Sequence, residues 1–388
     1  MAGGTYKKLT LKVPKKKRVL RTNTPMKVKD LFFLIDSFSP FFLQKEFDNS
    51  GIQFGDLNEK VKKILVSLDL TREVAEEALK NDANLIITHH PPIFFPLKKI
   101  IRNENSSLFK AITNKINLIS AHTNFDLANG GLNDYVANFL SITKLEPIEE
   151  SDEKIYKFVV YVPKDFAEKV RKAIFEAGAG KIGNYSETSF NMEGKGTFKP
   201  LEGSKPFMGK KGIRTEVNEI KIETVVPERF INKTVFAMKN AHPYEEPAYD
   251  IYEIKGNKSE GIGLIGKTAK ELTLNKYAIF VKEKLNAKNI RLIKSNERKI
   301  KRVALCTGAG ASLLSRVNNK SVDVFITGDI DYHKALCAKE MGLNIIEIDH
   351  FETEKFFIDA MIQKLIVLGI NKTVIIKSKS QKSPYEIL

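Results

Sequence analysis

The chain has 388 residues, of which 42% are apolar, so it can build the cores of two or three domains and is not globally disordered. No apolar run approaches the roughly 20 residues that a membrane-spanning helix needs, and no apolar stretch follows the basic N-terminus as in a secretory signal. The two cysteines, Cys306 and Cys337, give no disulfide framework, and we therefore expect a cytoplasmic protein.

The net charge of +16 points toward an anionic partner such as nucleic acid. Much of the excess lies in the first thirty residues, and the rest is spread as lysine, without an arginine-rich stripe that carries aromatic residues. Residues 1–25 lack helical or strand periodicity, and we predict a mobile basic arm or leader there. Its PKKKRV run, at 14–19, resembles a nuclear localisation signal, but such short runs often match by chance.

Folded structure is predicted to begin near Met26, with an apolar helical stripe at 28–35 and a turn-rich segment, FDNSGIQFGD, at 47–56. Short strands then alternate with helices, which is the βαβ pattern of a largely parallel sheet. The strands are predicted at 64–68, 85–88 and 118–120, and the helices at 72–81, 107–114 and 131–140.

The composition changes near Glu149, and the pattern becomes strand, helix, strand pair, helix and strand. This βαββαβ order is the ferredoxin-like arrangement, and it is complete in itself. Because it lies between two halves of another pattern, we predict an inserted domain at 154–256. Its elements are a strand at 156–163, a helix at 165–176, a strand pair reaching 227, a helix at 229–240 and a strand at 249–254.

The α/β pattern resumes at Gly261 and continues to the C-terminus. We therefore predict an α/β core built from residues 26–153 and 257–388, interrupted by an α+β domain. The strands of this second half are predicted at 303–306, 322–326, 344–348 and 374–377, and its helices at 275–285, 334–341 and 349–368.

Five of the six histidines fall just past predicted strand ends of the α/β core, where open α/β sheets bind their ligands. The clearest case is LIITHH at 85–90, a buried strand that ends in two imidazoles before Pro91 and Pro92 stop the ladder. A single histidine at a strand end is more often a structural residue than a metal ligand. For two adjacent histidines, metal binding and a structural role are equally plausible. The five are His89, His90, His122, His333 and His350.

The spacing of neighbouring acids favours metal binding. His350 and Glu354 are four residues apart at a helix start and share one face, and His122 and Asp126 have the same spacing past a strand end. Asp126 is therefore a plausible hard ligand with His122 beside it. Adjacent strand residues point to opposite sides, so a histidine pair suits two ions better than one.

The candidate ligands are His89, His90, Asp126, His350 and Glu354, a set with nitrogen and oxygen donors and no thiolate. Such a set suits two divalent ions of Zn, Fe, Mn, Co or Ni in an open, catalytic type of site. Two ions about 3.5–4 Å apart can activate a water and clamp a leaving oxygen. We expect His122 and His333 to support the ligands or to carry protons.

Two further segments border this predicted site. TGAGAS, at 307–312, joins a strand to a helix and could hold an anion on its backbone amides, although close backbone packing explains its glycines equally well. TGDIDYH, at 327–333, is interpreted as part of the site wall.

Four separated segments resemble, in the same order, the motifs of the Nif-three-like family, whose members carry the name GTP cyclohydrolase 1 type 2 homologue. The segments are LIITHHPPIFF, AHTNFDLANGGLND, TGDIDYHKALCAKEMG and IDHFETE. The resemblance covers the chain from Met26 onward and implies a dinuclear metal site on the same five candidate ligands. The family usually has glycine where this chain has Asp349.

The insert, which closes with AHPYEEPAYDIYEI, resembles the CutA- or PII-like domain of longer family members. Those members form toroidal hexamers, and the resemblance therefore implies a homohexamer. It also implies a metal-dependent hydrolase of GTP cyclohydrolase type, or one that acts on a related small phosphorylated or cyclic substrate. The alternatives are a non-catalytic metal-binding or regulatory protein, and a ring-shaped protein associated with nucleic acid.

Overall fold

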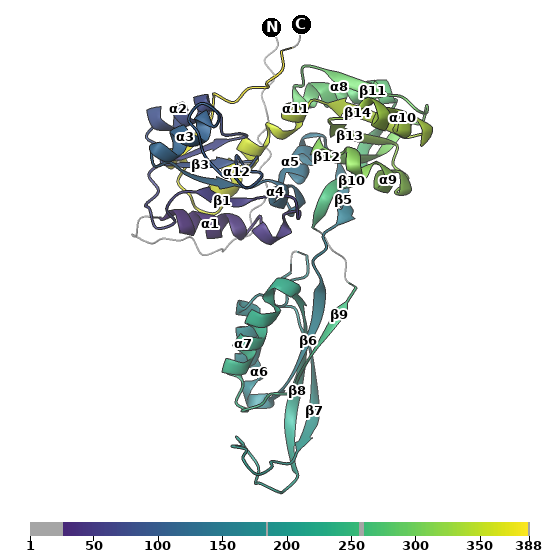
Figure 1. Cartoon of the computed structure of the whole chain (residues 1–388). Helices are drawn as coiled ribbons and strands as arrows, with labels where there is room; N and C mark the ends of the chain where they lie inside the picture. The colour runs from purple at the N-terminus through teal and green to yellow at the C-terminus, as the bar shows by residue number, and fades with distance from the viewer. Residues whose placement is uncertain (1–25, 184, 256–259, 387–388) are drawn as a thin grey trace. The chain divides into compact units, whose positions relative to one another are not determined.

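The computed structural model describes residues 26–183, 185–255 and 260–386 (Figure 1). The basic arm predicted at 1–25 lies outside these residues. The chain divides into two compact units, one made of Met1–Glu149 with Gly261–Leu388 and the other of Glu150–Glu260. Within the described ranges, none of the helices is long and apolar enough to cross a membrane.

The first unit contains a five-stranded sheet with the order β1-β4-β3-β2-β15. Strands β2, β3 and β4 are parallel neighbours, β15 from the C-terminal segment joins β2 in parallel, and β1 closes the other edge in antiparallel register. The bounds are Gly51–Phe54 for β1, Ile64–Ser67 for β2, Leu85–Thr88 for β3, Asn117–Ser120 for β4 and Ile375–Lys377 for β15.

The second sheet of this unit has six strands in the order β11-β14-β13-β12-β10-β5. Its centre, β12, β13 and β14, is parallel as the βαβ pattern predicts, but β10 and β11 flank it in antiparallel register. The prediction of one largely parallel sheet is therefore corrected to two mixed sheets. The bounds are Thr143–Glu150 for β5, Gly261–Leu272 for β10, Ile290–Ile293 for β11, Ile300–Ala309 for β12, Val324–Gly328 for β13 and Asn344–Ile348 for β14.

Helices of the first unit follow the strands closely. Thr71 begins α2 because its side chain accepts a hydrogen bond from the Val74 amide at 3.2 Å. The single helix predicted at 349–368 is two helices, α11 and α12. The bounds are Val28–Asp36 for α1, Arg72–Lys80 for α2, Ser106–Thr113 for α3, Thr123–Leu127 for α4, Leu132–Phe139 for α5, Leu274–Leu285 for α8, Leu314–Asn319 for α9, Tyr332–Glu340 for α10, His350–Glu354 for α11 and Phe357–Val367 for α12.

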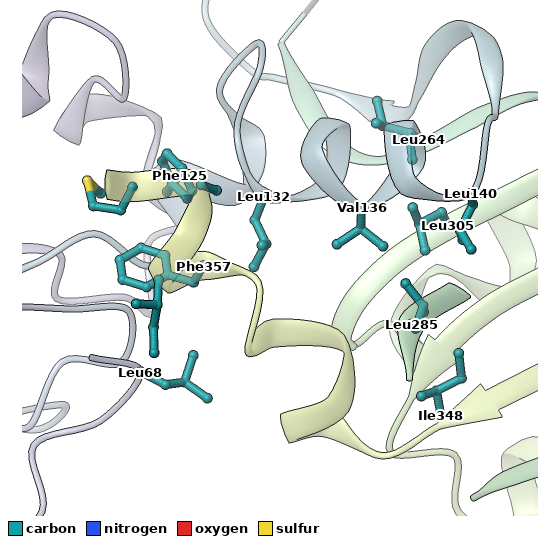
Figure 2. Close-up of a cluster of buried hydrophobic side chains, with 14 of the residues drawn as sticks. Leu68, Phe125, Leu132, Val136, Leu140, Leu264, Leu285, Leu305, Ile348 and Phe357 are labelled. Atoms are coloured by element: carbon teal, nitrogen blue, oxygen red, sulfur yellow. The ribbon is translucent and has the colours of Figure 1, made fainter. Parts of the chain in front are cut away.

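One apolar core connects the two sheets of this unit, as Figure 2 shows. Leu68 and Phe357 belong to its part near the first sheet, while Leu305 and Ile348 come from the second sheet, and all four are buried. Between them, α12 packs on β2 and β15, α5 packs on β10 and β12, and the two helices contact each other. The core therefore fixes the strand ends of one sheet against those of the other.

The second unit is a four-stranded antiparallel sheet in the order β7-β8-β6-β9, with α6 and α7 along one face (Figure 1). Phe158, Ile222 and Met238 are buried between the sheet and the helices. The chain order βαββαβ with this strand order confirms the predicted ferredoxin-like arrangement. The bounds are Ile155–Pro163 for β6, Ala167–Glu176 for α6, Phe190–Phe198 for β7, Thr215–Pro227 for β8, Ile231–Ala241 for α7 and Tyr249–Ile254 for β9.

Candidate metal centre

Four of the five strand-end histidines lie together in the first unit. The ring centroids of His89 and His90 are 5.1 Å apart, and that of His122 lies 5.1 Å from His89 and 5.4 Å from His90. The His350 ring lies 5.5 Å from His90. The fold thus gathers imidazoles from three distant segments of the chain at the carboxyl ends of β3, β4 and β14.

The local backbone explains how two neighbouring histidines enter one site. Strand β3 ends at Thr88, and the amides of His89 and His90 both donate to the Leu68 carbonyl, at 3.1 and 3.0 Å. This turn carries both residues out of the ladder just before Pro91. His122 sits at the N-cap of α4, directly after β4, and His350 begins α11, directly after β14.

Each of the four rings is held from behind through its Nδ1 atom, so that its Nε2 atom is the one left to face the centre. Such acceptors behind metal-binding histidines fix the ring orientation and the tautomer. The contacts are His89 to the Ala121 carbonyl at 2.8 Å, His90 to Asp69 at 2.7 Å, His122 to Asp48 at 2.8 Å and His350 to Asp329 at 2.6 Å.

Two buried carboxylates complete the arrangement. Glu354 Oε2 lies 2.9 Å from His90 Nε2 and 2.8 Å from His350 Nε2, and Asp126 Oδ1 lies 3.7 Å from His89 Nε2. His89 Nε2 and Asp126 Oδ1 are buried and neither has a partner in hydrogen-bonding geometry. Buried polar atoms almost always have partners, so a cation between these two atoms and the Glu354 carboxylate would satisfy both of them.

The donor atoms form two groups that could each hold a metal ion, with all atoms of a group within 4.8 Å of one another. One group is His89, His90 and His122, and the other is His90, His350 and Glu354, so His90 belongs to both. Asp126 belongs to neither group but lies 3.7 Å from His89 Nε2, so all five predicted ligands lie close together. The structure also places His122 among the donors, where the sequence led us to expect a supporting residue.

The electrostatics of the site favour added positive charge. Burial works against a charged imidazole at His90, but hydrogen bonds and the charges of Asp69 and Glu354 outweigh it and raise its pKa to about 10. The same balance, with Glu354 and Asp329, raises the pKa of His350 to about 9. Despite its burial, hydrogen bonds from the histidines lower the Glu354 pKa. Without a cation, protons on two imidazoles balance this carboxylate, and these are the protons that a metal ion displaces.

The pKa of the second buried carboxyl group is raised, unlike that of Glu354, and the pKa of the fully buried imidazole is lowered, unlike those of His90 and His350. Burial, reinforced by the charge of Glu354, raises the pKa of Asp126 well above its usual value. Burial also lowers the pKa of His89. A neutral imidazole with a free Nε2 lone pair is the form of histidine that binds a metal ion.

The glycine-rich segment TGAGAS provides close packing rather than an anion cradle, because three of its amides already donate to protein side chains. A Cβ atom on Gly308, whose φ is +64°, would lie 2.1 Å from Glu354 Oε1. Glycine at this position therefore leaves room for the Glu354 carboxylate. The amide bonds run from Thr307 to Asn133, from Gly308 to Thr353 and from Gly310 to Thr327, each at 2.9 Å.

Two predicted features lie apart from the gathered side chains. His333 is exposed in the first turn of α10, where its ring contacts Tyr332 at a centroid distance of 5.5 Å. Asp349, which replaces the family's usual glycine, caps α11 by accepting the Phe351 amide at 3.1 Å. Its carboxylate thus stabilises the turn that presents His350.

Sequence reasoning missed the functional importance of Asp48, Asp69 and Asp329. Asp69 and Asp329 could have been found by their place, because Asp69 follows strand β2 closely and Asp329 directly follows β13, whereas Asp48 lies before β1. Asp329 also has a φ of +52°, an unusual conformation for a residue other than glycine. The sequence alone does not show which carboxylate meets which imidazole.

Comparison with known proteins identifies a family that this chain matches over residues 26–384. The sequence profile of the family described as Duf34/NIF3 (NGG1p interacting factor 3) matches residues 26–384. The chain belongs to the Duf34/NIF3 family. The resemblance seen in the four sequence motifs is therefore confirmed.

Relatives of this Duf34/NIF3 chain are similar over nearly their full length. A Bacillus subtilis protein named GTP cyclohydrolase 1 type 2 homolog is 38% identical over 365 residues, which cover 92% of this chain and 97% of the relative. The crystal structure of a Bacillus cereus protein related to NIF3 has a TM-score of 0.82 at 36% identity, and covers 94% of this chain and 100% of that one. A Staphylococcus aureus structure has a TM-score of 0.75 at 30% identity, covering 94% and 99%.

Proposed function

We propose that this chain is a metal-dependent hydrolase that holds two divalent transition-metal ions and acts on a small cyclic or phosphorylated substrate, in a reaction of GTP cyclohydrolase type. The observation that carries the proposal is that two buried donor atoms without hydrogen-bond partners, His89 Nε2 and Asp126 Oδ1, lie beside the buried Glu354 carboxylate. The ligands would be the five predicted residues, with His122 beside them. Nitrogen and oxygen donors of this kind suit Zn, Fe, Mn, Co or Ni.

Bound ions would supply an activated water and polarise the substrate oxygen or nitrogen that develops charge. The chain's own residues then have separate tasks. Asp69 and Asp329 hold the rings of His90 and His350 by their Nδ1 atoms, at 2.7 and 2.6 Å. This fixed orientation lowers the cost of assembling the site, because the rings need not be ordered when the ions bind.

His122 is suited to move a proton. Asp48 accepts from its Nδ1 atom at 2.8 Å, and that carboxylate is itself held by the Thr123 amide at 3.1 Å and by the Ser50 hydroxyl at 2.8 Å. Those bonds and the interaction with His122 lower the pKa of Asp48 despite its burial, so that it stays ionised. An imidazole oriented in this way can take a proton at Nε2 and return it to a leaving group.

The substrate is proposed from the names of the relatives, several of which refer to GTP cyclohydrolase. Hydrolytic opening of the purine ring of GTP would release formate. The test begins with elemental analysis of the full chain purified without a chelating tag. We expect two transition-metal equivalents per chain, and fewer in His350→Ala. Protein that binds no transition metal under any loading condition would contradict the whole proposal.

The second part of the test is formate release from GTP by the metal-loaded chain. We expect the unmodified chain to release formate. His90→Ala should lose both the metal and the activity, whereas Asp48→Asn should retain the metal and release formate more slowly. His333→Ala should match the unmodified chain, since this imidazole lies apart from the site. Two bound ions with formate release no faster than in His90→Ala would instead support the non-catalytic metal-binding alternative.

A further inference from the structure

The insert carries a hollow of about 740 Å³ that the metal chemistry does not use. It lies on the face of the four-stranded sheet opposite α6 and α7. Cross-strand partners share a face, and the pairs Met192 with Lys221 and Gly194 with Glu219 line the hollow, whereas Ile220 and Ile222 point into the helix-covered core. All the lining residues belong to the second unit.

The floor of the hollow is made by glycines. Gly194 and Gly196 occupy alternate positions of β7 on this face, and a Cβ on Gly194 would meet no atom within 4 Å. A Cβ on Gly196 would lie 2.0 Å from Glu219 Oε2, so its absence admits that carboxylate. Glycine weakens a strand and often marks a place where a ligand approaches the backbone closely.

Aromatic rings form the walls. Tyr244 lies 5.7 Å from Phe198 and 6.4 Å from Phe207, measured between ring centroids. His242 holds this wall in place, because it binds the Tyr161 carbonyl at 2.9 Å and accepts the Tyr244 amide at 3.0 Å. Phe207 also contacts Phe166 at a centroid distance of 5.4 Å, yet it keeps 51% of its surface exposed, and a ligand in the hollow would cover part of that apolar surface.

The charge balance of the lining is negative. Lys195 and Lys221 are both neutralised by carboxylates outside the lining, Glu216 at 2.6 Å and Glu223 at 2.5 Å. Among the acids of the lining, Glu193 pairs with Lys164 at 2.9 Å. The other three, Glu219, Glu245 and Glu246, have no lysine or arginine ion pair among the described residues.

We propose that this hollow binds a small organic cation with a flat apolar body. The body lies on the two glycines of β7, between the aromatic walls, and the ammonium group faces Glu219 and the tyrosine rings. Aromatic faces attract cations, and carboxylates add charge complementarity that a neutral or anionic ligand lacks. This site is separate from the metal centre and does not depend on the hydrolase proposal.

The test uses the full chain and three probes that share an indole ring: tryptamine, a cation; indole, neutral; and indole-3-acetate, an anion. The chain contains no tryptophan, so the fluorescence anisotropy of the probe reports binding directly. We expect tryptamine to bind about tenfold more tightly than indole, and indole-3-acetate more weakly than either. No saturable binding of tryptamine, or equal binding of tryptamine and indole, would overturn the proposal.

Three variants locate the binding. Gly194→Val fills the floor with a strand-favouring residue that meets no neighbour, and it should abolish tryptamine binding. Asn191→Val changes the same strand on its other face, outside the lining, and should bind like the unmodified chain. Glu219→Gln keeps the side-chain shape and should weaken tryptamine several-fold while leaving indole unchanged.

Binding that persists in Gly194→Val would place the probe elsewhere and contradict the proposal. The same variant distinguishes a second occupant, another copy of this chain. If Gly194→Val changes the sedimentation coefficient while tryptamine does not bind the unmodified chain, the hollow is a contact between copies and the cation assignment is wrong.

Discussion

At the scale of single residues, the carboxylates behind the imidazoles are as informative as the ligands. Asp69 Oδ1 meets His90 Nδ1 at 2.7 Å, and its other oxygen accepts from Gln381 Nε2 at 3.0 Å. An aspartate in this position raises the basicity of the ring and fixes its direction. The metal affinity of the site should therefore depend on residues that never touch an ion.

We predict that Asp69→Asn weakens metal binding by about 10–100-fold, because the neutral amide keeps the shape but not the charge behind His90. Competition with a chromogenic chelator measures the change. Asp82→Asn is the matched control, since Asp82 is exposed and contacts Lys62 at 3.6 Å. Equal affinities in Asp69→Asn and in the control would contradict the role assigned to Asp69.

Gly308 offers a second prediction at this scale. Gly308→Ala would place a methyl group 2.1 Å from Glu354 Oε1, and we expect loss of metal binding as Glu354 is displaced. The control is Gly342→Ala, which has a similar φ of +69° but no atom within 4 Å. Both changes cost about 1–2 kcal/mol of backbone strain, so both lower the thermal midpoint. Metal affinity lost equally in both variants would show that strain alone is responsible.

The candidate ligands could be found from the sequence, because the spacing between a histidine and an acid, such as His350 and Glu354, is visible along the chain. The carboxylate or carbonyl that holds each imidazole ring could not be predicted from the sequence. Asp48 and His122 are 74 positions apart, and only the packing of β1 on β4 brings their segments together. Pairings of this kind depend on tertiary structure, which leaves no periodic trace in the sequence.

At the scale of elements, the C-terminal segment stabilises the sheet whose strands lead into His89, His90 and His122. After β15, Ser378 Oγ donates to Glu77 of α2 at 2.7 Å, and the amides of Lys379 and Ser380 donate to the same carboxylate at 2.9 and 3.1 Å. Gln381 then reaches Asp69. The segment thus connects α2 to the carboxylate behind His90.

The contact between the C-terminal segment and α2 should depend on pH through the Glu77 carboxylate. Burial alone would raise its pKa, but the hydrogen bonds from Ser378, Lys379 and Ser380 outweigh burial and lower the pKa below 4.5. A carboxylate whose pKa is lower in the folded than in the unfolded state stabilises the folded state fully at pH values above its unfolded-state pKa. This stabilisation is lost as the pH falls through the folded-state pKa. We therefore expect the Lys379 and Ser380 amides to lose hydrogen-exchange protection below pH 4.5.

Protection factors of the C-terminal peptide, corrected for intrinsic exchange, measure this effect. Glu77→Gln should reduce protection at neutral pH and remove the pH dependence, whereas Glu73→Gln, an exposed residue of the same helix, should change neither. If Glu77→Gln keeps the pH profile of the unmodified chain, the carboxylate does not control the docking.

Two of the strands that the sequence failed to predict have a common physical cause. Strands β5 and β11 lie at the two edges of the second sheet, and β5 reads TKLEPIEE, with charges and a proline. Edge strands tolerate such residues because one side of the ladder stays unpaired. The buried central strand VFITG of β13, by contrast, was visible as an apolar run.

At the scale of the whole molecule, the charge is unevenly divided. Residues 1–25 contain eight of the 63 lysines and arginines and none of the 47 acids, so the remaining chain carries a net charge of +8 from 55 basic and 47 acidic residues. Many basic side chains of the described residues lie against acids, such as Lys377 against Asp359 at 2.7 Å. The homohexamer implied by the family stays a prediction, which sedimentation of the full chain can test.

The uneven distribution of charge along the chain predicts how its binding to nucleic acid should depend on salt. We expect the full chain to bind duplex DNA without sequence preference, with a slope of log affinity against log salt of about 0.9 for each phosphate contact. Deleting residues 1–25 should remove most of the binding and flatten the slope, because that segment has eight basic and no acidic residues, whereas the rest of the chain offsets 55 basic residues with 47 acidic ones. Filter binding over a salt series measures both chains. A slope that is unchanged by the deletion would place the contacts on the folded body and favour a ring that acts on nucleic acid.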